Sequence, residues 1–71
     1  MTAERLVHMA NQIARFFAAY PHDQAVESIA DHLKKFWEPR MRKQIAAYIE
    51  STGGTGLDPL ALEAIGKLAA A

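Results

Sequence analysis

Prolines and glycines divide this chain at three places, and every interval between them carries a helical pattern of apolar residues. A proline inside a helix loses a backbone hydrogen bond and collides with the preceding turn, at a cost of about 3 kcal/mol, so Pro21 and Pro39 each mark a break. The segment Gly53-Gly-Thr-Gly56 marks the third, because glycine adopts the strained backbone angles that turns require. Four helices are therefore predicted, at about residues 3–19, 21–37, 39–51 and 58–68, with a glycine-rich loop at 52–57.

These intervals predict an all-α fold, a small bundle or array of three longer helices and one short C-terminal helix in a single domain, 1–71. Asp58 is a suitable N-cap for the last helix, and Gly66 weakens its second half by about 1 kcal/mol relative to alanine. Apolar residues recur three and four positions apart, as on one face of an amphipathic helix. The predicted buried faces are Leu6, Met9, Ile13, Phe16 and Phe17 in the first helix; Ala25, Val26, Ile29, Ala30, Leu33 and either Phe36 or Trp37 in the second; and Met41, Ile45, Tyr48 and Ile49 in the third.

The core of such a chain is thin, since 71 residues bury only about 60% of the surface that the unfolded chain exposes. Four apolar faces are too much surface for so small a volume. Some of this surface is therefore expected to face a partner. The aromatic side chains that cannot all be buried are Phe16, Phe17, Phe36, Trp37 and Tyr48.

Composition excludes several classes of protein. Eight basic residues balance eight acidic ones, so the chain lacks the basic excess expected of a nucleic-acid binder. It contains no cysteine, which excludes disulfides and thiolate metal sites and gives no sign of an oxidising compartment. The sequence has neither an uninterrupted signal-peptide core nor the roughly 18 apolar residues of a membrane span, so a cytoplasmic location is expected.

The joint between the second and third predicted helices, residues 29–41, combines the only tryptophan, a proline and most of the positive charge. Arg40 and Arg42 lie in the first turn of the third helix, where the helix dipole disfavours cations. An acidic surface, a carboxylate or a phosphate bound there would offset that cost, although a solvated charge run that binds nothing explains the pattern equally well. The basic residues of the joint are Lys34, Lys35, Arg40, Arg42 and Lys43.

Trp37 has two interpretations, a core residue at a helix end or a contact with a partner. Tryptophan and arginine are enriched in binding hot spots, and here both flank a rigid turn. We therefore predict an interface in which Phe36 and Trp37 are apolar anchors and the arginines pair with acidic groups at the rim. Its residues are Phe36, Trp37, Pro39, Arg40, Met41 and Arg42.

No catalytic, cofactor-binding or metal site is predicted in this chain. His8, His22 and His32 lack the i, i+4 spacing of a helical zinc site. The glycine loop precedes Leu57-Asp58-Pro59, which puts a carboxylate where a phosphate would bind. No nucleophile and base are suitably paired either, so the sequence does not predict an enzyme.

A small helical DNA-binding module or another protein-interaction module is the alternative, and in the DNA-binding case residues 39–51 would be the recognition helix. Arg40, Arg42 and Lys43 near a helix start are suitable for phosphate and base contacts. The zero net charge and the apolar Met41 on the same helix count against it.

Several segments resemble the delta subunit of cytoplasmic NAD-dependent formate dehydrogenase, and the resemblance covers about residues 6–68. Its most specific part is the Phe-Trp-x-Pro-Arg-Met pattern at residues 36–41. The matching segments are Met9-Ala-Asn-Gln-Ile13 with Phe16-Phe17, then Ile29-Ala-Asp-His-Leu33 and Lys35-Phe-Trp-Glu-Pro-Arg-Met41, and finally Gly56-Leu-Asp-Pro-Leu60.

This resemblance implies a small non-catalytic accessory subunit of a complex that oxidises formate to carbon dioxide. In such complexes the large alpha subunit holds a bis-molybdopterin guanine dinucleotide centre with molybdenum or tungsten, together with iron–sulfur clusters. The beta subunit holds FMN and the NAD site, and a gamma subunit adds another cluster. The delta subunit is expected to bind the alpha subunit and to support assembly, cofactor incorporation or stability. The absence of cysteine agrees with a chain that ligates no iron–sulfur cluster itself.

Overall fold

The computed structural model describes residues 2–70, and over that range it consists of four α-helices with no strand, which confirms the all-α prediction. Each helix begins and ends within two residues of the predicted position. The last helix has 12 residues and is therefore nearly as long as the third, which has 14. It continues through Gly66 because that residue lies in open space on the exposed side, where glycine weakens a helix without breaking it. The helices are α1 (Ala3–Phe17), α2 (His22–Phe36), α3 (Pro39–Thr52) and α4 (Pro59–Ala70).

The helix ends follow from local chemistry. The Thr2 hydroxyl accepts a backbone hydrogen bond from three residues ahead, which caps α1. Pro21 is the N-cap of α2 rather than its first residue, because its backbone is extended while its carbonyl already accepts the Ala25 N–H at 2.8 Å. Gly53 adopts a left-handed φ of 78° and donates its N–H to the Ile49 carbonyl, which ends α3.

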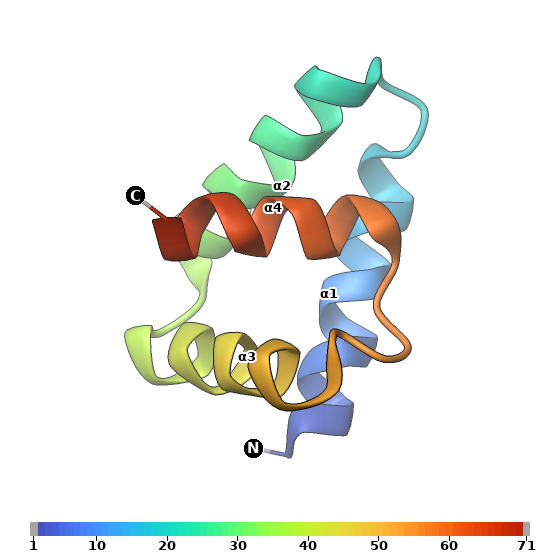
Figure 1. Cartoon of the computed structure of the whole chain (residues 1–71). Helices are drawn as coiled ribbons and strands as arrows, with labels where there is room; N and C mark the ends of the chain where they lie inside the picture. The colour runs from blue at the N-terminus through green and yellow to red at the C-terminus, as the bar shows by residue number, and fades with distance from the viewer. Residues whose placement is uncertain (1, 71) are drawn as a thin grey trace.

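The helices pack as a compact array rather than a parallel bundle (Figure 1). α4 lies across α2, while α1 contacts the other three helices in turn. α2 and α3 are consecutive in the chain but diverge from the joint that connects them, and both pack on α1 or α4 instead of on each other. The joint is therefore a corner of the molecule.

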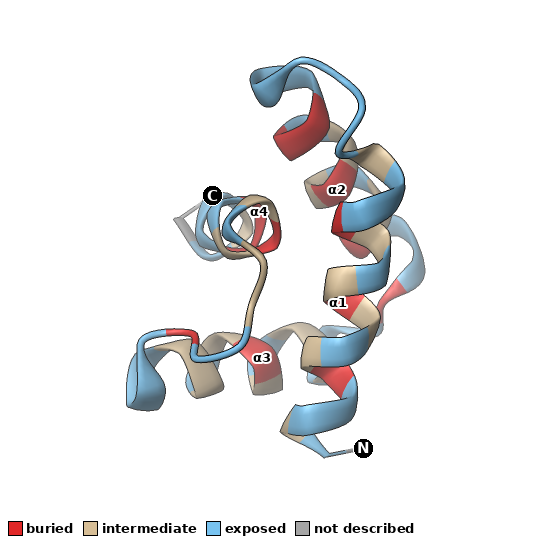
Figure 2. Cartoon of the chain, turned by 90° about the vertical axis from the view of Figure 1, so that its right-hand side faces the viewer, coloured by how far each residue is buried: buried red, intermediate tan, exposed pale blue. Residues whose placement is uncertain are grey.

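The buried residues lie where the helices face one another (Figure 2), and five alanines stand among larger aliphatic side chains in this core. The predicted buried face of α1 is partly wrong: Leu6 is buried as expected, but Phe16 is 74% exposed and Met9 and Ile13 are only partly buried. Alanines are the fully buried neighbours of Leu6, because small side chains let the helix backbones approach closely. The buried core residues are Leu6, Ala10, Ala14, Ala25, Val26, Ile29, Leu33, Trp37, Ile45, Ala61, Ala64 and Ile65.

The structure also decides between the two aromatic residues at the end of α2, because Trp37 is buried in the core and Phe36 is exposed. In α3 only Ile45 is buried, while the other three predicted core residues pack partly buried against the core. The excess of apolar surface expected from the sequence is thus present on the folded chain, at Phe16 and Phe36 above all.

Candidate partner-binding surface

The joint between α2 and α3 is made by two residues with extended backbones. Trp37 ends α2 with φ −89° and ψ 135°, and its N–H donates to the Leu33 carbonyl at 3.0 Å. Glu38 follows with φ −65° and ψ 150°, as the residue before a proline tends to do, and Pro39 then begins α3. The helix thus ends between the two aromatic residues of the joint, with Phe36 as its last residue and Trp37 as its C-cap.

Phe36 and Trp37 therefore have opposite environments although they are adjacent in sequence. The Trp37 side chain is only 5% exposed and belongs to the core, whereas Phe36 is 71% exposed. The Phe36 ring is held by the His32 ring one turn earlier, with 4.7 Å between the ring centroids. The tryptophan is thus a core residue in this chain; its contact with a partner stays a prediction.

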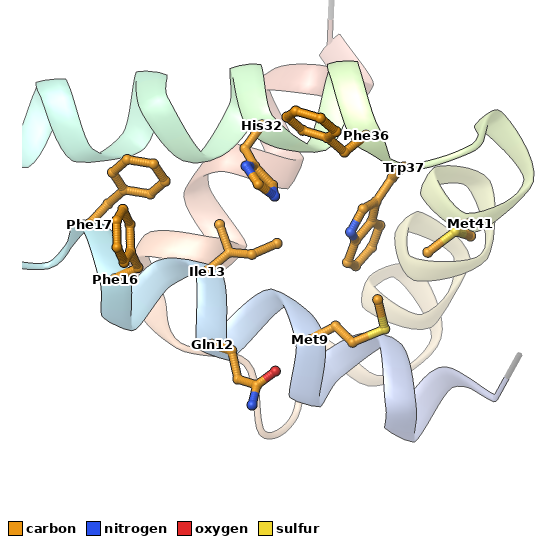
Figure 3. A pocket seen from close by; sticks show the side chains of 9 residues that line it. All are labelled: Met9, Gln12, Ile13, Phe16, Phe17, His32, Phe36, Trp37 and Met41. Carbon is orange, nitrogen blue, oxygen red and sulfur yellow. The ribbon is translucent and has the colours of Figure 1, made fainter.

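An apolar groove of about 550 Å³, the aromatic groove, opens on one side of the joint (Figure 3). α1 forms one wall, the end of α2 forms the other, and the Trp37 indole lies between them. Phe16 and Phe17 meet edge to face at one end, with ring centroids 5.0 Å apart. The lining residues are Met9, Gln12, Ile13, Phe16, Phe17, His32, Phe36, Trp37 and Met41.

A second groove of about 620 Å³, the basic groove, lies on the other side of Trp37. Its walls are the end of α2, the beginning of α3 and the second half of α4, and the cations Lys34, Arg42 and Lys43 line it together with apolar side chains. The apolar lining residues are Leu33, Trp37, Pro39, Ile45, Ala46, Ile65, Leu68 and Ala69.

The predicted interface residues are divided between these two grooves. Phe36 and Met41 line the aromatic groove, Pro39 and Arg42 line the basic groove, and Trp37 lines both. Arg40 is exposed and is not among the described residues that line either groove. The sequence prediction missed the contributions of α1 and α4, because these helices reach the joint only through the tertiary fold. The missed lining residues include Met9, Ile13, Ile65 and Leu68, whereas Lys34 and Lys43 belong to the basic cluster that the sequence had singled out.

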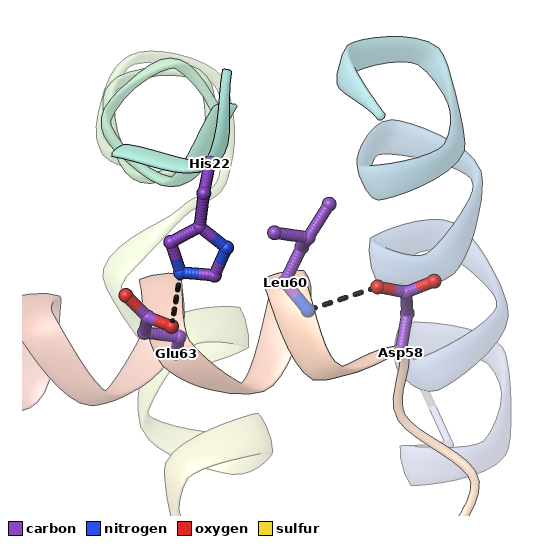
Figure 4. A network of polar contacts seen from close by, with 4 residues as sticks. All are labelled: His22, Asp58, Leu60 and Glu63. Carbon is purple, nitrogen blue, oxygen red and sulfur yellow. Dashed lines mark hydrogen bonds and ion pairs between the residues drawn. The ribbon is translucent and has the colours of Figure 1, made fainter. Parts of the chain in front are cut away.

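The glycine loop is held by internal hydrogen bonds. The Asn11 side chain donates to the Gly56 carbonyl at 2.9 Å and accepts the Asp58 N–H at 2.8 Å, which ties the loop to α1. The Tyr48 hydroxyl donates to the Thr55 carbonyl at 2.6 Å. The predicted N-cap of α4 is confirmed, because the Asp58 carboxylate accepts the Leu60 N–H at 2.9 Å (Figure 4). The loop therefore has a structural role, connecting α3 to α4.

The histidines are distributed over the surface. His22 contacts Glu63 with 2.8 Å between Nε2 and Oε1, which links α2 to α4 (Figure 4). His8 is exposed and His32 stacks on Phe36. Within the described part of the chain, no three histidine, aspartate or glutamate side chains come together as metal ligands would. None of the helices between residues 2 and 70 has the length and apolar character needed to cross a bilayer.

Comparison with known protein families supplies the context for these grooves. The model of the family described as "NADH-dependant formate dehydrogenase delta subunit FdsD" matches residues 5–65. The chain belongs to this family. No curated protein and no solved structure matches it. The region matched to the delta-subunit family contains the whole aromatic groove and all of the basic groove except Leu68 and Ala69. The predicted resemblance is thereby confirmed, and a delta subunit is by its description one part of a formate dehydrogenase of several subunits.

Proposed function

We propose that this chain is a non-catalytic accessory subunit of NAD-dependent formate dehydrogenase that binds the large, molybdopterin-containing alpha subunit. In this role it supports assembly, cofactor incorporation or stability of the cytoplasmic complex, which also contains beta and gamma subunits. The match to the delta-subunit family over residues 5–65 is the observation that carries the proposal. The bis-molybdopterin centre, iron–sulfur clusters, FMN and NAD site are assigned to the other subunits.

The distribution of apolar surface supports a binding role. Phe16 and Phe36, 74% and 71% exposed, stand at the aromatic groove beside the partly buried Met9 and Met41. Contiguous apolar surface of this kind marks interaction sites in soluble proteins. A partner that covers it would also stabilise the chain, because ligands that bind only the folded state shift the unfolding equilibrium.

The composition of the chain supports the assignment of redox chemistry to the other subunits. An iron–sulfur cluster is held chiefly by cysteine thiolates, and this sequence has no cysteine. The charge distribution also favours a subunit over a DNA-binding module. In α3, Ile45 is buried and Met41 is partly buried, and the eight basic residues are balanced by eight acidic ones.

A pull-down with the tagged chain, coexpressed with the other subunits, tests the proposal. We expect mass spectrometry to identify the large subunit, and we expect Phe36→Ser to reduce its recovery. Tyr20→Ser is the matched control, because Tyr20 is also an exposed aromatic residue, at 46%, but does not belong to the described lining of either groove. Recovery of nucleic acid alone, or of no formate dehydrogenase subunit, would refute the proposal.

A further inference from the structure

The basic groove has an unbalanced charge. Among the described residues that line it, three are cationic and none is acidic. Lys34 lies in the last turn of α2, and Arg42 and Lys43 lie near the start of α3. The ion pairs formed within residues 2–70 join other side chains, Lys35 to Asp31 and His22 to Glu63, so these three cations have no carboxylate partner in the described chain.

The start of α3 adds to this imbalance. α1 and α2 each have an acidic residue in the first turn, Glu4 and Asp23, but α3 has none. The side chain of its N-cap, Glu38, makes no capping hydrogen bond among the described residues. Cations at a helix N-terminus are unfavourable, because the helix dipole is positive at that end. The folded chain thus presents three cations at this groove that no carboxylate in its described part pairs with.

The floor of the same groove is apolar. Leu33, Trp37, Ile45 and Ile65 are core residues whose outer edges form it, and Leu68 of α4 borders it partly buried. An occupant that matches both features carries apolar groups flanked by carboxylates. Nucleic acid matches this groove less well, because its phosphates would pair with the three cations but would leave the apolar floor exposed to water.

We propose that the basic groove binds an acidic amphipathic helix of the large catalytic subunit, an inference that depends on the proposed function. Apolar side chains spaced three and four residues apart would pack on Leu33, Ile65 and Leu68. Aspartate or glutamate residues flanking them would pair with Lys34, Arg42 and Lys43. A segment of two to three turns is about 10 residues and about 15 Å long, which suits a molecule whose longest dimension is 29 Å.

Charge reversal tests the electrostatic part. Arg42→Glu with Lys43→Glu changes two lining residues, and Arg5→Glu with Lys67→Glu makes the same change of net charge outside both the predicted interface and the described lining of the two grooves. Each is coexpressed with the other subunits as a tagged full chain. We expect the groove pair to reduce recovery of the large subunit about tenfold or more, and the control pair to change it less than about twofold. Circular dichroism of each purified chain verifies folding, which acidic residues at the start of α3 favour.

Cross-linking identifies the occupant. The chain has no cysteine, so Ala46→Cys places a single thiol in the basic groove, and Ala47→Cys places one on the exposed side of the same helix. A thiol-reactive photo-cross-linker is attached to each purified chain before it is assembled with the other subunits. We expect the thiol at position 46, and not the one at 47, to cross-link to a segment of the large subunit that is rich in acidic residues and has helical apolar spacing.

The outcomes separate the two proposals. If the wild-type chain recovers the large subunit but the groove pair recovers it equally well, the proposal for the groove is wrong and the accessory-subunit function stands. Cross-links from position 46 to a second copy of this chain, to a segment without acidic residues, or to nothing would also overturn it. If the wild-type chain recovers no large subunit, the proposed function itself fails.

Discussion

Replacing Trp37 by alanine should remove a large part of the stability of this chain, whereas replacing the adjacent Phe36 should remove little. The Trp37 side chain is 5% exposed, and truncating a buried aromatic side chain to alanine costs about 3–5 kcal/mol. Both grooves border the indole, so the cavity left behind opens to water and the lower figure, about 3 kcal/mol, is expected. A domain of 71 residues has a total stability of roughly 4–10 kcal/mol.

The corresponding figure for Phe36 is much smaller. Its side chain is 71% exposed, so it buries less than a third of the surface whose full burial is worth about 1.5–3 kcal/mol. Phe36→Ala should therefore cost about 0.5–1 kcal/mol. Urea unfolding followed by circular dichroism measures both variants without relying on tryptophan fluorescence.

Trp37→Phe keeps the comparison informative if Trp37→Ala does not fold, because it retains an aromatic ring and should cost about 1–2 kcal/mol. Equal losses for Phe36→Ala and Trp37→Ala would refute the assignment of one residue to the core and the other to the surface. So would a Trp37→Ala variant with the unfolding midpoint of the wild type.

Three further predictions concern the loop before α4, and urea unfolding measures all of them. Gly54→Ala should lose about 1 kcal/mol more than Gly53→Ala: both positions have left-handed φ, at 87° and 78°, but only at Gly54 would the added Cβ meet a side chain, 2.7 Å from Leu62 Cδ1. Equal losses would show that the contact is relieved without cost. Asn11→Ala should cost about 1–3 kcal/mol because two hydrogen bonds to the loop disappear, and Asn11→Leu, which restores volume alone, should be no more stable. Asp58→Ala should cost about 1 kcal/mol through loss of the N-cap, and Asp58→Asn, which keeps the acceptor, should recover most of it; an equally damaged asparagine variant would contradict the cap.

The helices could be predicted from the sequence because their ends depend on neighbouring residues. The backbone is affected only within one or two residues of Pro21, Pro39 and Gly53. The prolines act through a fixed φ angle and a missing N–H, and the glycine acts through its freedom to adopt a positive φ. Burial was harder to predict. The periodic spacing of apolar residues predicted Phe16 as a core residue, but Ala10 and Ala14 are buried instead. A hydrophobic pattern does not show which helix crosses this face or how closely it approaches.

The candidate site could be predicted only in part, because it too depends on how distant segments pack together. The joint was recognisable because its tryptophan, proline and cations are contiguous in sequence. The grooves were not, since each needs side chains from distant segments: Phe16 and Phe36 meet at the aromatic groove, and Lys34 and Leu68 at the basic one. The two Asn11 hydrogen bonds could not be predicted either, because they join residues that lie 45 and 47 positions apart in the sequence.

The position of Trp37 determines how binding at this joint can be tested. Because its indole borders both grooves and also completes the core, any substitution there changes the stability of the chain together with the shape of both surfaces. A loss of partner binding in Trp37→Ala is therefore no evidence that a partner contacts the ring. Phe36 and Arg42 avoid this ambiguity, since Phe36 is largely exposed, Arg42 is only partly buried, and each borders a single groove. A partner that occupies only the aromatic groove should respond to Phe36→Ser and not to Arg42→Glu, and one that occupies only the basic groove should show the reverse. If both variants weaken binding while both chains remain folded, the large subunit covers both grooves of the joint. Trp37, which borders both grooves, then lies between the two contacts.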